Sequence, residues 1–198
     1  MSLLELIAVA DERGLAASGL ACLDRCLPLL ADGGEPELLR PLWGSCEDGR
    51  DWDTRLTAAR EAMEGEDVAD ETAALVRKML GAAPSDWSAD PLREWARACS
   101  LVALEIHRQF DIPTGGDTGG DGVQDSTEQL KRWSAGEADG AGPLVAGELH
   151  RQIKILETLA ETAGTAGSAG GLRGALDRST EGRRVLRAVM SRRARGRS

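Results

Sequence analysis

The stretch DPLREWARACSLVALEIHRQF, residues 90–110, decides the fold class of this chain. Asp90 followed by Pro91 is typical of a helix start, because aspartate caps free backbone N–H groups and proline fits the first helical turn. One side of the stretch carries apolar residues at helical spacing, namely Val102, Ile106 and Phe110. This pattern predicts a long amphipathic helix over 91–110.

Part of this helix recurs later in the chain. LVALEIHRQF at 101–110 returns as LVAGELHRQI at 144–153, with seven of ten positions identical. Both copies predict helix, and they contain the only two histidines, His107 and His150. We therefore expect two related helices in the core.

The rest of the chain also favours helices. No window alternates strictly between apolar and polar residues, and only 3% of residues are aromatic, so a sheet is not expected. Ser2 and Glu5 have the spacing of a capping box, and this first helix is expected to end near Gly14. The fold class predicted is all-α, an irregular helical bundle of about six to eight helices with a basic C-terminal helix or tail.

Composition divides the chain into three parts. Residues 1–163 are expected to form an acidic, all-helical domain that contains a flexible Gly/Asp-rich loop at 111–125. Residues 164–171 are small and predict a linker. Residues 172–198 predict an arginine-rich C-terminal helix and tail.

Charge is distributed unevenly along the chain. The net charge is −9, but residues 172–198 hold nine arginines and only two acids, a balance of +7. The remainder of the chain therefore carries −16. A basic amphipathic helix of this kind suggests binding to an acidic partner. The candidate partner-binding residues are Arg183, Arg184, Arg187, Arg192, Arg193 and Arg195.

Two other interpretations of this tail stay open. It is either solvated, or folded back against the acidic stretch at 47–71, which holds ten acids. Nucleic acid is a further partner class, but the tail has no aromatic residue for base stacking, so a protein partner is favoured. Association of the chain with itself also stays open. The leading hypothesis is a non-enzymatic helical interaction or regulatory protein.

The two related helices suggest an alternative, a small-ligand or enzymatic pocket made by Glu105, His107, Glu148 and His150. Within each helix Glu and His are two residues apart, about 200° around the axis, so one helix cannot present both to one ligand. Di-metal bundles use Glu-x-x-His instead, and no metal is predicted. The simpler interpretation places each histidine beside an apolar stripe and pairs Glu105 with Arg108 and Glu148 with Arg151.

Residues 117–128 carry acidic residues and glycine in a rhythm that resembles the EF-hand calcium loop. Asp117, Asp121, Asp125 and Glu128 fall at its positions 1, 5, 9 and 12, and Gly122 at position 6. The resemblance covers only these twelve residues and implies calcium binding, a second alternative. Gly119 offers no side-chain oxygen at position 3, which favours a solvated linker whose end caps the next helix.

The sequence also suggests a cellular compartment and bears on cofactor binding. No apolar run reaches the 18 or more residues of a membrane span, and no basic region precedes an apolar run at the N-terminus. We expect a cytoplasmic protein in which the four cysteines, Cys22, Cys26, Cys46 and Cys99, are buried thiols. No nucleophile or phosphate-loop motif is found, so no cofactor is predicted.

Overall fold

A computed structural model of the protein describes residues 1–30, 36–63, 71–111, 122–164 and 168–196. Within these residues the chain forms nine α-helices and no strand, which confirms the all-α class. None of these helices combines the length and apolar character that crossing a lipid bilayer requires. In chain order they are α1 (Leu3–Val9), α2 (Glu12–Cys26), α3 (Arg40–Ser45), α4 (Trp52–Met63), α5 (Glu71–Gly81), α6 (Ala89–Asp111), α7 (Gly122–Ser134), α8 (Pro143–Glu161) and α9 (Ser168–Arg195).

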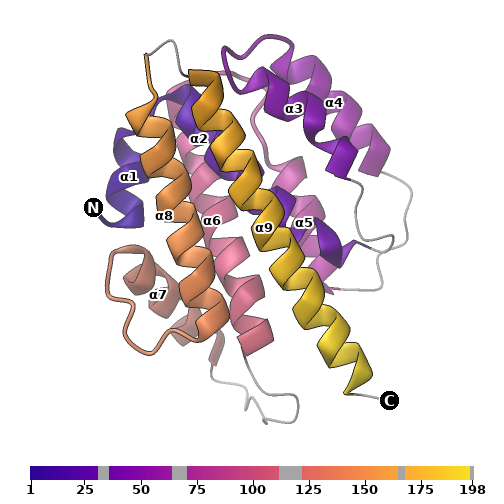
Figure 1. Ribbon diagram of the computed structural model, residues 1–198, viewed down its shortest axis with the longest axis vertical. Helices are drawn as coiled ribbons and strands as arrows, with labels where there is room; N and C mark the ends of the chain where they lie inside the picture. The colour runs from indigo at the N-terminus through magenta and orange to yellow at the C-terminus, as the bar shows by residue number, and fades with distance from the viewer. Residues whose placement is uncertain (31–35, 64–70, 112–121, 165–167, 197–198) are drawn as a thin grey trace.

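Helix α2 is the centre of the molecule. Every residue from Arg13 to Cys26 is buried, because α6, α8 and α9 pack around this helix (Figure 1). Small residues let the neighbours approach closely. At Gly19 a Cβ atom would lie 2.5 Å from the indole ring of Trp95, so only glycine leaves room for that ring.

The first two helices are separated by a cap. The capping box at α1 is confirmed, since the Ser2 hydroxyl accepts from the Glu5 backbone and the Glu5 carboxylate accepts from the Ser2 backbone. The expectation that this helix runs to Gly14 is wrong. It ends at Val9, and the Asp11 side chain accepts a hydrogen bond from the Gly14 N–H and starts α2.

The end of α6 contacts the start of α8, the other helix of the related pair. Asp111, the last residue of α6, accepts hydrogen bonds from the backbone N–H groups of Leu144 and Val145 at 3.0 and 2.9 Å. These groups belong to the first turn of α8, where N–H groups have no partner inside their own helix. A cap from another helix therefore fixes how α8 starts relative to α6.

Indole rings fill the space between α4, α5 and α6. Trp52 packs edge-on against Trp87 and Trp95, with ring centroids 5.2 and 6.0 Å apart. Two of these indole N–H groups have backbone acceptors: Trp52 donates to the Pro84 carbonyl and Trp95 to the Met79 carbonyl. These bonds fix the ring orientations in an otherwise aliphatic core.

Helix α9 crosses α2 and α8, and its C-terminal end projects beyond them (Figure 1). It begins at Ser168, four residues before the start expected at 172. Ala175, Ser179 and Leu186 are each fully buried in the core. The C-terminal helix, at least as far as Leu186, is therefore part of the same packed body as α2 and α8.

Candidate functional site

An ion pair lies at the centre of the bundle, where α2 and α8 meet. The Arg25 guanidinium donates to both Glu148 carboxylate oxygens, with Nη2 2.6 Å from Oε1 and Nε 2.8 Å from Oε2. Both side chains are 0% exposed. A bidentate arginine–carboxylate contact of this kind is among the stronger hydrogen-bonded pairs in proteins.

Polar side chains from α6 and α8 surround this pair. Gln152 donates to Glu148 Oε1 at 2.9 Å, and the Ser100 hydroxyl donates to Gln152 Oε1 at 2.6 Å. His107 Nε2 lies 3.7 Å from Glu148 Oε2, while its Nδ1 donates to the Ala103 carbonyl at 2.7 Å. We call Arg25, Glu148, His107, Gln152 and Ser100 the buried network. It ties α2, α6 and α8 together.

The electrostatics of the buried network favour its charged form. Burial by itself would raise the pKa of the Glu148 carboxyl, but Arg25, together with His107 and Gln152, holds that pKa below its usual value. The pKa of Arg25 is raised: burial opposes its charge, and the Glu148 carboxylate outweighs the burial. The charges therefore persist in the interior because each compensates the other.

Three thiols lie in the same part of the core. Burial raises the pKa of Cys22 to about 12, and it also raises the pKa values of Cys26 and Cys99. A thiol becomes a nucleophile only as its thiolate. These cysteines therefore stay protonated. All four cysteines are free and buried, which confirms their expected state.

The four residues of the predicted pocket divide among three places. Glu148 and His107 meet in the buried network, whereas His150 is exposed on α8. Glu105 lies at the surface of α6, where it accepts two hydrogen bonds from Arg108 at 2.8 Å, as the spacing predicts. The expected Glu148–Arg151 pair is wrong, because the Glu148 carboxylate turns inward to Arg25.

Arg25 and Gln152 are not among the residues predicted from the sequence. A signal for Arg25 exists: Asp24 and Arg25 stand together inside the apolar stretch at 15–30. Charged residues in a helix that is buried all round must find partners. The sequence could not say which partner, because Glu148 lies 123 residues away along the chain.

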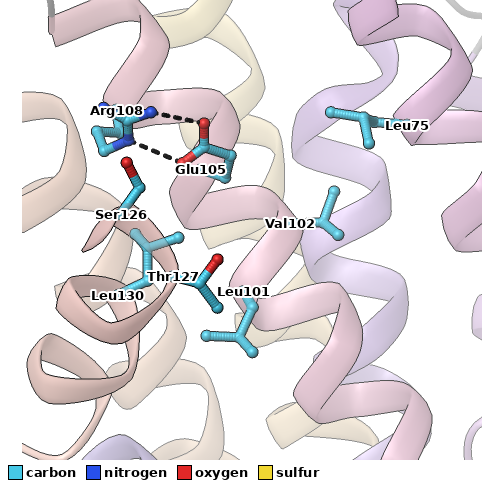
Figure 2. Close-up of a pocket in the computed structure, with 8 residues that line it drawn as sticks. All are labelled: Leu75, Leu101, Val102, Glu105, Arg108, Ser126, Thr127 and Leu130. Carbon is cyan, nitrogen blue, oxygen red and sulfur yellow. Dashed lines mark hydrogen bonds and ion pairs between the residues drawn. The ribbon is translucent and has the colours of Figure 1, made fainter. Parts of the chain in front are cut away.

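A groove lies on the other side of α6, between α5 and α7 (Figure 2). We call it the α6 groove. Its volume is about 270 Å³. The side chains from α6 form the floor, with Leu75 of α5 on one side and the α7 residues on the other. Its lining residues are Leu75, Leu101, Val102, Glu105, Arg108, Ser126, Thr127 and Leu130.

Arg183 and Arg193, from the predicted partner-binding set, bond to other helices of the molecule. Arg183 donates to Asp24 at 2.8 Å, and Ser179 donates to the other Asp24 oxygen at 2.7 Å. Burial raises the pKa of Asp24, with the Ser179 and Arg183 contacts opposing that rise. Arg193 donates to the carbonyls of Gln109 and Phe110.

The Arg193 contact stabilises the end of α6 in two ways. Its guanidinium carbon lies 4.8 Å from the centre of the Phe110 ring, a cation–π geometry. It also supplies hydrogen bonds to carbonyls that have no partner inside the last turn of a helix. The other four arginines of the predicted set, Arg184, Arg187, Arg192 and Arg195, have exposed side chains.

Metal binding was considered both for the helical bundle and for the loop that resembles an EF-hand. Among the residues that the structure describes, no group of three or more His, Cys, Asp or Glu side chains is placed to hold a metal ion. The calcium hypothesis depends on Asp117 and Asp121, which lie outside the described residues. The helix that follows this loop begins at Gly122, inside the twelve residues of the resemblance.

Comparison of the chain with protein-family models, with curated proteins and with solved structures found no match. We therefore infer function from the geometry of the buried network, the α6 groove and the C-terminal arginines.

Proposed function

We propose that the protein is a non-enzymatic helical interaction protein and that the C-terminal half of α9 contacts an acidic surface of a protein partner. The observation that carries this proposal is the exposure of Arg184, Arg187, Arg192 and Arg195 on a helix whose inner side is fixed to the body. We call these four side chains the basic face. Residues 182–198 contain seven arginines and no acidic residue.

The geometry of α9 supports a defined surface. At 100° per residue the four arginines fall within an arc of about 140°, and they span about 16 Å along the axis. Leu186, on the opposite side, is fully buried. Arg183 and Arg193 fix the helix to α2 and to the end of α6. A pre-ordered array of arginines loses less conformational entropy on binding than a disordered tail does.

The chemistry favours an acidic protein surface over nucleic acid. The chain outside 172–198 carries 31 acids and 15 bases. Its net negative charge would repel the phosphate backbone of a nucleic acid bound to the basic face. The basic face has no aromatic neighbour in 172–198 on which a base could stack. Arginine is enriched at protein interfaces, where its fork pairs with carboxylates.

Two features support a role without catalysis. The Glu148 carboxylate is taken up by Arg25 and Gln152, and the raised pKa of Cys22 keeps its thiol protonated. The four free, buried thiols also fit a reducing compartment, so we place this function in the cytoplasm.

The proposal is tested in the full chain by replacing the four arginines of the basic face with glutamate. Its matched control reverses four exposed arginines elsewhere: Arg97, Arg132, Arg173 and Arg178. Both variants change the net charge by the same amount. We expect both to stay folded, because all eight side chains are exposed.

The measurement is capture of partners from the native host at low and at high salt, with and without nuclease. A partner of the basic face should bind the wild type and the control variant, and it should be lost from the basic-face variant and at high salt. Equal capture by all three proteins would remove the basic face from the proposal. Capture that nuclease abolishes would assign the basic face to nucleic acid.

A further inference from the structure

The α6 groove is the feature of the surface that the proposed function does not use. Four aliphatic side chains line most of it, Leu75, Leu101, Val102 and Leu130. The pair Glu105–Arg108 and the hydroxyl residues Ser126 and Thr127 add polar groups (Figure 2). An apolar cleft with a few polar groups is the usual composition of a small-molecule site.

The size of the groove limits what it can hold. A volume of about 270 Å³ corresponds to roughly nine water molecules at about 30 Å³ each. One turn of a helix, about 10 Å across and about 5.4 Å long, occupies roughly 420 Å³ and exceeds this volume. The occupant is therefore a small molecule of about ten non-hydrogen atoms.

The Glu105–Arg108 pair determines which polar head group a ligand of the groove can carry. The Glu105 carboxylate already accepts three hydrogen bonds, two from Arg108 and one from Gln109 at 3.2 Å. Arg108 uses Nε and Nη2 for Glu105, and its Nη1 group makes no hydrogen bond to any described residue. An added head group must therefore accept a hydrogen bond from a cation, which a carboxylate does best.

We propose that the α6 groove binds a short aliphatic carboxylate. Its hydrocarbon chain lies on the four aliphatic side chains, and its carboxylate accepts from Arg108. The aliphatic contacts supply affinity by removing apolar surface from water, and the arginine selects an anionic head group over a cationic one.

A second groove in the molecule provides a comparison. It lies between α1, α2 and α8, has a volume of about 240 Å³, and is lined by apolar residues such as Leu6, Leu156 and Leu159. Asp11 is the one charged residue in its lining. A carboxylate would meet repulsion there, so the second groove should not bind the same molecule.

The experiment titrates the full chain with octanoate, followed by calorimetry and by shifts of backbone amide signals. We expect saturable binding with a dissociation constant between about 10 μM and 1 mM, a range that suits so small a ligand. Octylamine, with the same chain and a cationic head, should bind at least tenfold more weakly. The largest amide shifts should occur at Leu101, Val102 and Thr127.

Three variants locate the site. Val102→Phe should fill the α6 groove and Arg108→Gln should remove its cation, each weakening octanoate at least tenfold. Ala160→Phe, an exposed position in the lining of the second groove, should leave binding unchanged. Circular dichroism checks that each variant folds, and if Val102→Phe does not, Arg108→Gln and the shift map decide.

Absence of octanoate binding overturns the proposal. So does loss of binding in Ala160→Phe without loss in the α6 groove variants. Equal affinity for octylamine would show that the head group is not recognised, which contradicts the role of Arg108. None of these results bears on the basic face, whose test is separate.

Discussion

At the residue scale, the Arg25–Glu148 pair is the most consequential contact. Moving a carboxylate or a guanidinium into an interior costs several kcal/mol per ion, and only a close partner offsets that cost. Here the partners are 2.6 Å apart and fully buried. The pair therefore adds little net stability, but loss of one partner leaves an uncompensated charge in the core.

The first prediction concerns that asymmetry. Arg25→Met alone should lower the free energy of unfolding by about 3–5 kcal/mol, whereas the double variant Arg25→Met/Glu148→Leu should recover most of the loss. Glu37→Gln is the control, because its pair with Arg40 is 66% and 70% exposed and should contribute about 0–1 kcal/mol. Urea unfolding measures all three. A double variant as unstable as Arg25→Met would contradict the argument.

The second prediction is the pH dependence of the same pair. The folded-state pKa of Glu148 is lowered from 4.5, so its contribution is present above about pH 4.5. That contribution is lost as pH falls through the lower folded-state value, because the unfolded chain then binds the proton first. The free energy of unfolding should therefore fall more steeply below pH 4.5 in the wild type than in Arg25→Met/Glu148→Leu. Parallel curves would show that other carboxylates cause the acid sensitivity.

At the element scale, α2 depends on small residues. A helix buried on all sides must let its neighbours come close, and bulk at the contact points would push them apart. Gly19 sits against the Trp95 ring, and Ala16, Ala17 and Ala21 are also fully buried. Packing in this region has no room for an added methyl group.

The third prediction tests this packing. Gly19→Ala should destabilise the protein by about 1–3 kcal/mol, although alanine is the better helix former, because its Cβ would lie 2.5 Å from Trp95. Gly174→Ala in α9 is the matched control. Its Cβ would meet Thr158 at an ordinary 3.5 Å, so it should stabilise by about 0.5–1 kcal/mol. Thermal unfolding compares the two, and a stable Gly19→Ala variant would show that Trp95 can move.

At the scale of the whole molecule, α9 has two roles along its length. Buried residues as far along as Leu186 complete the core, and Arg193 still bonds to the end of α6. The outer side of the C-terminal half presents the basic face, and the end of the helix projects beyond the body (Figure 1). The structural part and the proposed binding part therefore belong to one continuous helix.

The fourth prediction uses truncation to test whether the fold requires α9. A chain that ends at residue 167 lacks all of α9 and exposes apolar surface of α2 and α8, so it should lose cooperative unfolding. A chain that ends at Arg193 keeps the buried residues and the Arg193 contact with the end of α6. Its midpoint of thermal unfolding should stay close to that of the full chain. Cooperative unfolding of the shorter chain would show that α9 is not needed for the core.

Local physical chemistry allowed the sequence to predict the helices. Pro91 in the first turn of α6, the capping box at Ser2 and the apolar stripe through Val102 depend on neighbours within one or two turns. For the same reason the Glu105–Arg108 pair was correct. The expected cap at Asp90 is wrong, because α6 already begins at Ala89 and the Asp90 carboxylate accepts from Arg93. The charge difference between the body and residues 172–198 is likewise a property of composition.

Tertiary structure alone decided which distant groups meet. Glu148 faces Arg25 and not Arg151 because α2 passes through the centre of the bundle, and a buried guanidinium there attracts the carboxylate inward. The position of α9 across the body likewise engages Arg183 and Arg193 and leaves the basic face outside. Helical periodicity fixes the side of a helix on which a residue lies, but the partner on that side depends on packing between segments more than a hundred residues apart.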